Sequence, residues 1–337
     1  MRDGETMSED HLAVLVRKPA SEATMARFRE RGVYDDSRKV RAHDADRVEL
    51  PVTEIPPGYD AVVQEAPEFR GNDLPTLLRE RGFDDAEIER APASWAVVGD
   101  VILVAFGDCE RRTEVGEALL ELHGEAHTVL ARGGVDGELR EPDVQVIAGD
   151  GDTETVHTEH GTQYALDLAE VMFSPGNKAE RARMADVVAD GERVFDMFAG
   201  IGYFTLPMAR AGARVTAVEK NPTAFGFLVE NVVLNGVQDR VSATRGDCRD
   251  VSTSAERVVM GYYDAPAYLD TALDALEPGG VAHVHATVPD AVYPERPHEK
   301  IEAAADAAGR AFEILDTRTV KTHSEGVRHA VVDVRFA

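Results

Sequence analysis

The sequence predicts an α/β protein in which a doubly wound, Rossmann-like sheet forms the C-terminal half and small α+β domains precede it. Two observations favour this class. Apolar segments alternate with helical patterns from residue 185 to residue 337. Within that half, residues 194–207 pass from an apolar strand through the turn Ala-Gly-Ile-Gly, residues 199–202, into a helical pattern. In doubly wound folds a ligand binds beyond the carboxyl end of such a strand, where glycines let the backbone approach it closely.

Three domains are expected within the 337 residues. The first, residues 1–65, is a small α+β domain, and the second, residues 66–165, is another. The third, residues 166–337, carries the Rossmann-like sheet. The predicted elements of the first two domains are strands at 13–16 and 47–52, helices at 21–31, 74–81, 84–90 and 114–123, a hairpin at 94–106 that turns at Gly99-Asp100, and strands within 144–156.

The third domain is predicted to alternate strands with helices. A strand ends at Phe173, a turn follows at 174–177, and a helix then carries Arg181. Arg181 has two open interpretations: it forks onto a carboxylate or a phosphate, or it is an arginine of the helix surface that pairs with an acid. The later elements are strands at 194–196, 214–219, 240–247, 257–263, 279–287 and 331–336, and helices at 267–276 and 299–310.

Acidic residues end three successive strands of this domain, as a nucleoside site requires. They are Asp196, Glu219 and Asp247. Glu219 lies roughly 20 residues beyond the glycine turn, which is the spacing at which a carboxylate binds ribose hydroxyls. No third glycine follows in register, so the turn differs from the motif of dinucleotide-binding proteins. The alternative interpretation is that Glu219 and Asp247 cap the helices that follow them.

The formal net charge is -26, and it has two interpretations. An acidic surface repels anionic partners, or it is the surface of a protein from a halophilic archaeon, where ~1 M salt cuts the Debye length to about 3 Å. We favour the second interpretation because the acidic excess is spread along the chain and is not confined to a tail. Local clusters of arginine then indicate the partners better than the net charge does.

Other features of the sequence predict a cytoplasmic protein without a metal centre. Cys109 and Cys248 are its only cysteines, which supports neither a disulfide framework nor a zinc cluster. The sequence contains no apolar run of ~18 residues and does not begin with a signal peptide. The spacing of His157 and His160 fits no metal-ligand template. His283 and His285 face the same side of a strand but have no evident third ligand, so we expect them to pack under the site or to contact substrate.

Four segments carry a resemblance to a known family: residues 173–181, 196–207, 217–222 and 227–235. They resemble the S-adenosylmethionine enzymes that modify position 37 of tRNA. That group contains guanine-N1 methyltransferases and their relatives in wybutosine biosynthesis, which transfer an aminocarboxypropyl group. The resemblance covers the chain well from residue 94 to its C-terminus, and residues 1–65 resemble more loosely the N-terminal domain of the methyltransferases.

The segment 260–266, Met-Gly-Tyr-Tyr-Asp-Ala-Pro, separates the two branches of that group. The methyltransferases have an Asn-Leu-Pro-like loop there that holds the target base, whereas this segment resembles the archaeal aminocarboxypropyltransferases. Residues 280–285, 294–297 and 326–333 resemble them too, and Gly176 stands near the place of a methyltransferase arginine. The resemblance therefore implies transfer of the 3-amino-3-carboxypropyl group to C7 of 4-demethylwyosine at position 37 of tRNA(Phe). The alternatives are guanine-37 N1-methylation and non-catalytic tRNA binding.

The resemblance also implies the co-substrate, the partner and the site. S-adenosylmethionine is the expected co-substrate, and the anticodon stem-loop of tRNA(Phe) is the expected partner, with residues 66–165 contributing to tRNA binding and no obligate protein partner. Ser174 and Arg181 are expected to steer the aminocarboxypropyl arm. The catalytic group is unknown, and its candidates are Asp264 and His285. The residues expected to bind the co-substrate are Ser174, Arg181, Asp196, Gly200, Gly202, Glu219, Asp247 and Cys248.

Overall fold

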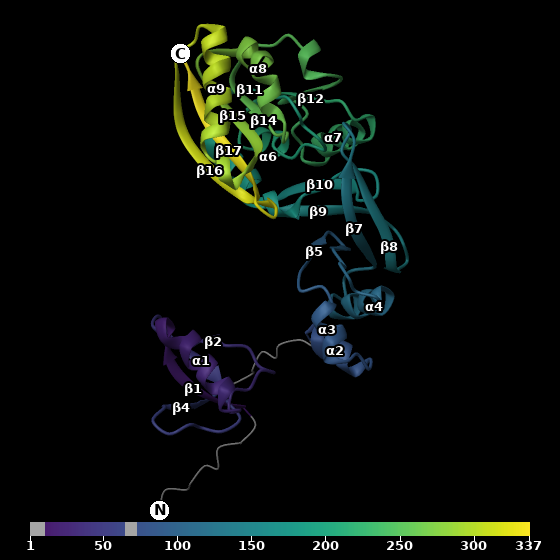
Figure 1. The fold of residues 1–337 in the computed structure, drawn as a ribbon, viewed down its shortest axis with the longest axis vertical. Coiled ribbons are helices and arrows are strands. Elements are labelled where there is room, and N and C mark those ends of the chain that lie inside the picture. The colour runs from purple at the N-terminus through teal and green to yellow at the C-terminus, as the bar shows by residue number, and fades with distance from the viewer. Residues whose placement is uncertain (1–10, 65–72) are drawn as a thin grey trace, which may run out of the picture. The chain divides into compact units, whose positions relative to one another are not determined.

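A computed structural model describes residues 11–64 and 73–337 (Figure 1). The chain divides into two compact units, residues 1–89 and residues 90–337. The domain boundary expected between residues 65 and 66 lies outside the described residues. No helix in the described part of the chain is long and apolar enough to cross a membrane.

The first unit contains a four-stranded antiparallel sheet with strand order β2-β3-β1-β4. Phe28 of the helix α1 packs against Val14 and Leu50 of the sheet, because alternate strand residues face the same side. The strands predicted at 13–16 and 47–52 and the helices predicted at 21–31, 74–81 and 84–90 are confirmed. The elements are β1 (Leu12–Arg17), α1 (Ser21–Glu30), β2 (Arg41–Ala42), β3 (Arg47–Pro51), β4 (Ala61–Val63), α2 (Leu74–Glu80) and α3 (Asp85–Arg90).

The second unit begins with a four-stranded sheet of order β5-β6-β7-β8. The hairpin predicted at 94–106 is confirmed, and Gly99 provides the positive φ of +59° that its turn needs. The strand β7 pairs in parallel with β6 and was not predicted, because Gly133 and Gly134 interrupt its apolar alternation. The elements are β5 (Trp95–Val98), β6 (Val101–Val104), α4 (Arg112–Leu122), β7 (Thr128–Asp136) and β8 (Glu141–Gly149).

A two-stranded hairpin follows, formed by β9 (Glu154–Glu159) and β10 (Thr162–Asp167). The prediction that a strand reaches Phe173 is wrong, since β10 ends at Asp167 and residues 168–173 form a loop. Leu168, Val171 and Phe173 are nevertheless buried in the core of this unit. Apolar side chains that enter a core from a loop look the same in sequence as the residues of a buried strand.

A seven-stranded sheet of order β13-β12-β11-β14-β15-β17-β16 forms the C-terminal half. The first five strands in this order are parallel, and β17 and β16 continue the sheet in antiparallel pairings. The long strand β16 was not predicted, because its second half is mostly polar. The strands are β11 (Arg193–Asp196), β12 (Arg214–Glu219), β13 (Val241–Arg245), β14 (Ala255–Met260), β15 (Leu276–Pro289), β16 (Phe312–Ser324) and β17 (Val327–Phe336).

Helices cover both faces of this sheet, which confirms the doubly wound α/β class (Figure 1). Neighbouring residues of β11 show the two faces: Val194 shares a core with α5, α6 and α7, whereas Phe195 shares a core with α8 and α9. The last of these helices begins at Glu295, earlier than predicted. The helices are α5 (Lys178–Val187), α6 (Thr205–Arg210), α7 (Pro222–Leu234), α8 (Leu269–Ala275) and α9 (Glu295–Ala308).

Candidate functional site

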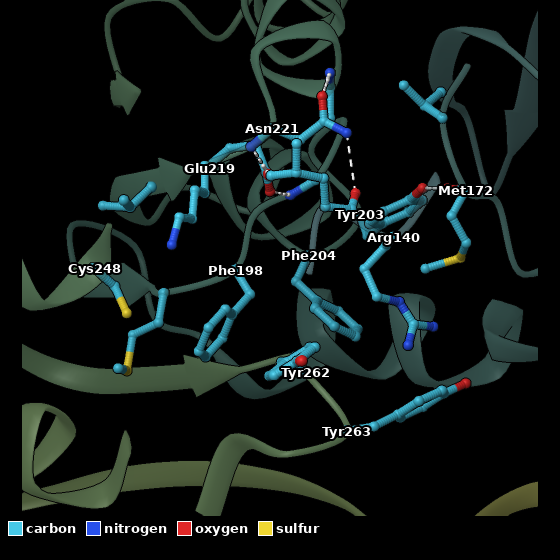
Figure 2. A pocket seen from close by; sticks show the side chains of 18 of the residues that line it. Arg140, Met172, Phe198, Tyr203, Phe204, Glu219, Asn221, Cys248, Tyr262 and Tyr263 are labelled. Carbon is cyan, nitrogen blue, oxygen red and sulfur yellow. Dashed lines mark hydrogen bonds between the residues drawn. The ribbon is translucent and has the colours of Figure 1, made fainter. Parts of the chain in front are cut away.

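A pocket opens at the carboxyl ends of β11, β12 and β14, and Figure 2 shows side chains that line it. The strand order reverses between β11 and β14, and ligands of doubly wound folds bind at such a point. The lining residues come from eight parts of the chain: 138–140; Val171, Met172, Ser174 and Asn177; Arg181; Met197, Phe198, Gly200, Tyr203 and Phe204; 218–221 and Ala224; 246–248; 261–263 and Tyr268; and His329. Segments that lie far apart in the sequence therefore meet at one site.

The glycine turn and Glu219 form one hydrogen-bonded unit at the end of the pocket (Figure 2). The backbone amides of Gly200 and Asn221 each donate to the carboxylate of Glu219, with N–O distances of 2.7 Å. Gly200 has a φ of +56°, and a Cβ there would lie 2.3 Å from the Tyr203 ring, so glycine is required. Burial raises the pKa of Glu219, and the two amides oppose that shift. The carboxylate is thus held in place beside the pocket.

Asp247 lies on the pocket wall beside Cys248, and both residues line it. Asp247 caps the short 3-10 helix Cys248–Asp250 by accepting from the backbone amide of Arg249 at 3.0 Å. The side chain of Arg249 hydrogen-bonds the same carboxylate and holds its pKa well below the ordinary value. The capping alternative therefore describes Asp247, whereas Asn221 and not Glu219 caps α7.

Asp196 and Gly202 lie behind the pocket and do not line it. Asp196 is fully buried and accepts a hydrogen bond from the Thr205 hydroxyl at 2.7 Å. Burial raises its pKa to about 6. A Cβ on Gly202 would lie 2.7 Å from Leu206, so this glycine lets α6 pack against the turn. Asp196 and Gly202 therefore support the glycine turn from the protein core.

Arg181 lines the pocket, but its guanidinium is already paired with a carboxylate of the protein. Its guanidinium makes a bidentate ion pair with Glu159 of β9, with N–O distances of 2.7 and 2.8 Å. A third bond, of 3.0 Å, goes to the carbonyl of Ser174. Burial raises the pKa of Glu159, but His157 and Arg181 outweigh burial and bring the pKa to about 2. Arg181 therefore forks onto a carboxylate of the protein itself, and both partners are buried, so it is not an arginine of the helix surface. The bond to the Ser174 carbonyl ties this pair to the loop that holds Ser174.

The sequence patterns did not indicate two cationic residues of this region, Arg140 and Lys321. Arg140 lines the pocket and lies over the Tyr263 ring, 4.9 Å from its centroid. Lys321 of β16 donates its ammonium to the Ser174 hydroxyl. No local motif marks either residue, because Arg140 lies in a turn and Lys321 lies on a strand that the sequence pattern did not reveal.

Aromatic side chains form part of the pocket lining. Figure 2 shows Phe198, Phe204 and Tyr262 grouped on one side, with Tyr263 next to Arg140. The rings of Phe198 and Tyr262 lie 5.2 Å apart between centroids. Such a surface suits a flat base, because aromatic faces stack on nucleobases.

The two catalytic candidates do not line the pocket. Asp264 is exposed on the loop after β14. His285 is buried on β15, packs against Phe204 and contacts His329, with a distance of 2.9 Å between Nδ1 and Nε2. Burial lowers the pKa of His285 to about 3, so its imidazole is neutral at physiological pH. Within residues 11–64 and 73–337, no group of three or more His, Cys, Asp or Glu side chains is placed to hold a metal ion.

Two family models match the second unit and the end of the first. The model described as the TRM5/TYW2 methyltransferase domain matches residues 155–315, and the TYW2 N-terminal domain matches residues 75–153. Among curated proteins, the tRNA(Phe) (4-demethylwyosine(37)-C(7)) aminocarboxypropyltransferase of Pyrococcus horikoshii is 41% identical over 254 residues. That similarity covers 74% of this chain and 91% of the relative.

Two solved structures represent the two branches of this group. TYW2 from P. horikoshii, solved in complex with MeSAdo, is 37% identical with a TM-score of 0.69, covering 77% of this chain and 96% of that one. Trm5b from Pyrococcus abyssi, named as a tRNA (guanine(37)-N(1))-methyltransferase, is 30% identical with a TM-score of 0.74, covering 97% of this chain and 99% of that one. The sequence identity is higher to the first branch, and the coverage of this chain is larger for the second.

Proposed function

The chain belongs to the TRM5/TYW2 family, and we propose that it transfers the 3-amino-3-carboxypropyl group of S-adenosylmethionine to C7 of 4-demethylwyosine at position 37 of tRNA(Phe). The reaction belongs to the biosynthesis of wybutosine derivatives. The anticodon stem-loop is the part of tRNA that must enter the pocket, because it carries position 37.

The observation that carries the proposal is the loop after β14, which supplies tyrosines to the pocket. Residues 260–266 contain no asparagine, and Tyr262 and Tyr263 line the pocket in its place. A methyltransferase of guanine N1 needs polar groups on the hydrogen-bonding edge of the base. A tricyclic base that reacts at carbon needs stacking surfaces and precise placement, which aromatic side chains provide.

The position of S-adenosylmethionine relative to the acceptor base decides which of its groups is transferred. The sulfonium of S-adenosylmethionine activates three carbons, and the carbon that lies in line with the nucleophile is transferred. C7 attacks the methylene of the aminocarboxypropyl arm, the C–S bond breaks, methylthioadenosine keeps the electron pair, and C7 loses its proton. We propose that Glu219, Asp247 and the glycine turn hold the adenosine part, and that the loop of Ser174 and Arg181 directs the arm toward C7.

A paired labelling experiment tests the proposal. Phenylalanine tRNA with 4-demethylwyosine at position 37 is incubated with S-adenosylmethionine labelled in its carboxyl carbon or in its methyl carbon. We expect carboxyl label in the tRNA and release of methylthioadenosine. Methyl label on unmodified guanine 37, with release of S-adenosylhomocysteine, would make the chain an N1-methyltransferase, the alternative that the larger coverage by Trm5b favours.

The surface charge belongs to the same proposal. We propose that the net charge of -26 suits a concentrated salt solution, in which the tRNA phosphates and the acidic surface are screened from each other. We also propose that residues 1–165, apart from residues 138–140 of the pocket lining, bind parts of tRNA distant from position 37.

A further inference from the structure

Lys321 occupies an unusual position for a lysine. It projects from β16 onto the turn that carries Ser174, a residue of the pocket lining, and its ammonium donates to the Ser174 hydroxyl. A Cβ on Gly176 would lie 3.2 Å from Cδ of Lys321, so the side chain packs closely along this turn. The lysine therefore stands directly behind the pocket wall.

The surroundings of Lys321 are positively charged. Burial is the main cause that lowers its pKa, to about 8, and the charges of Arg132, Arg181 and Arg140 add to the effect. No carboxylate of the described residues contributes to that shift or bonds the ammonium. Arg181 has its own carboxylate, Glu159, and does not share it with Lys321. A partly buried cation among cations is stabilised when an anion joins it.

We propose that Lys321, together with the Ser174 hydroxyl, binds the carboxylate of the aminocarboxypropyl arm of S-adenosylmethionine. This inference rests on the proposed function and names a residue that positions the transferred group. In the proposed function Glu219 binds the ribose, so a carboxylate anchored at Ser174 would hold the arm between two fixed points of the pocket. The methylene carbon next to sulfur then lies along the pocket, and the methyl group is left without an anchor.

The site favours a carboxylate over a phosphate of the tRNA backbone. Lys321 is partly buried, and its ammonium contacts the loop through a single small hydroxyl. A compact carboxylate at the end of a flexible arm reaches such a place from inside the pocket. A backbone phosphate approaches from outside, and arginine forks such as Arg140 suit it better.

The test compares two ligands that differ only in the carboxylate: S-adenosylmethionine and its decarboxylated form. Their dissociation constants are measured by calorimetry with the whole chain and with three variants. Lys321→Met removes the charge and keeps the apolar stem, Lys321→Arg keeps the charge, and Lys178→Met removes an exposed lysine at the start of α5. Affinity of each protein for tRNA is measured by gel shift.

We expect Lys321→Met to weaken S-adenosylmethionine about 10- to 100-fold, which is the usual effect of losing a hydrogen bond between charged groups. The decarboxylated ligand should bind that variant as it binds the unchanged protein, which also shows that the variant is folded. Lys321→Arg should restore most of the affinity, and Lys178→Met should change nothing.

Equal losses for both ligands, or no loss for either, would overturn the proposal. Weaker tRNA binding with unchanged S-adenosylmethionine affinity would assign Lys321 to the RNA backbone instead. These measurements need no group transfer, so they remain informative if the labelling experiment identifies a methyltransferase, and the two conclusions fail separately.

Discussion

Removal of the Glu219 carboxylate should abolish most of the affinity for S-adenosylmethionine while the fold persists. Each oxygen of this carboxylate already accepts one backbone amide at 2.7 Å, from Gly200 and Asn221. Glu219 lines the pocket, and the proposed function assigns two ribose hydroxyls to its remaining lone pairs. A hydrogen bond to a charged group contributes about 1.5–3 kcal/mol, so two of them contribute roughly 3 kcal/mol or more. The dissociation constant of Glu219→Ala should therefore rise about 100-fold or more.

Calorimetric titration measures this change, and thermal unfolding followed by circular dichroism reports on the fold. The matched control is Glu230→Ala, which removes an exposed glutamate from α7 of the same sheet domain. The control should bind S-adenosylmethionine as the unchanged protein does. An affinity of Glu219→Ala within about threefold of the control, well under 1 kcal/mol, would refute the assignment of the ribose to this carboxylate.

Three further predictions concern tRNA, salt and pH. A chain that begins at residue 73 should keep its affinity for S-adenosylmethionine, because all pocket residues lie beyond that point, and should bind tRNA more weakly in gel shifts. Unchanged tRNA binding would give residues 1–72 another role. Transfer activity should rise from ~0.1 M to ~2 M KCl, opposite to the usual loss of nucleic-acid affinity with salt, and a steady fall would refute the halophilic interpretation. Affinity for S-adenosylmethionine should fall as the pH rises past about 8, because Lys321 then loses the proton that a bound carboxylate favours. Arg132, Arg140 and Arg181 are the other charged groups around Lys321, and the fall should be absent in Lys321→Met.

The sequence by itself determined the C-terminal fold and one end of the site. Alternating apolar segments predicted the doubly wound sheet, because the periods of strands and helices are local properties. The glycine turn and Glu219 were also recognisable, because both lie at the ends of neighbouring parallel strands and such ends meet at one edge of the sheet. The assignment of these residues to S-adenosylmethionine stays a prediction until Glu219→Ala is measured.

The tertiary structure decided what each charged side chain contacts. Arg181 pairs with Glu159, 22 residues earlier, and Lys321 meets Ser174 across 147 residues. In the folded chain the strand β10 ends at Asp167, and the catalytic candidates Asp264 and His285 lie outside the pocket lining. Propensity and periodicity act over a few residues, whereas these contacts arise where separate strands and loops come together in the folded chain. A sequence pattern therefore located the glycine turn and Glu219, and only the packed fold revealed Arg140 and Lys321.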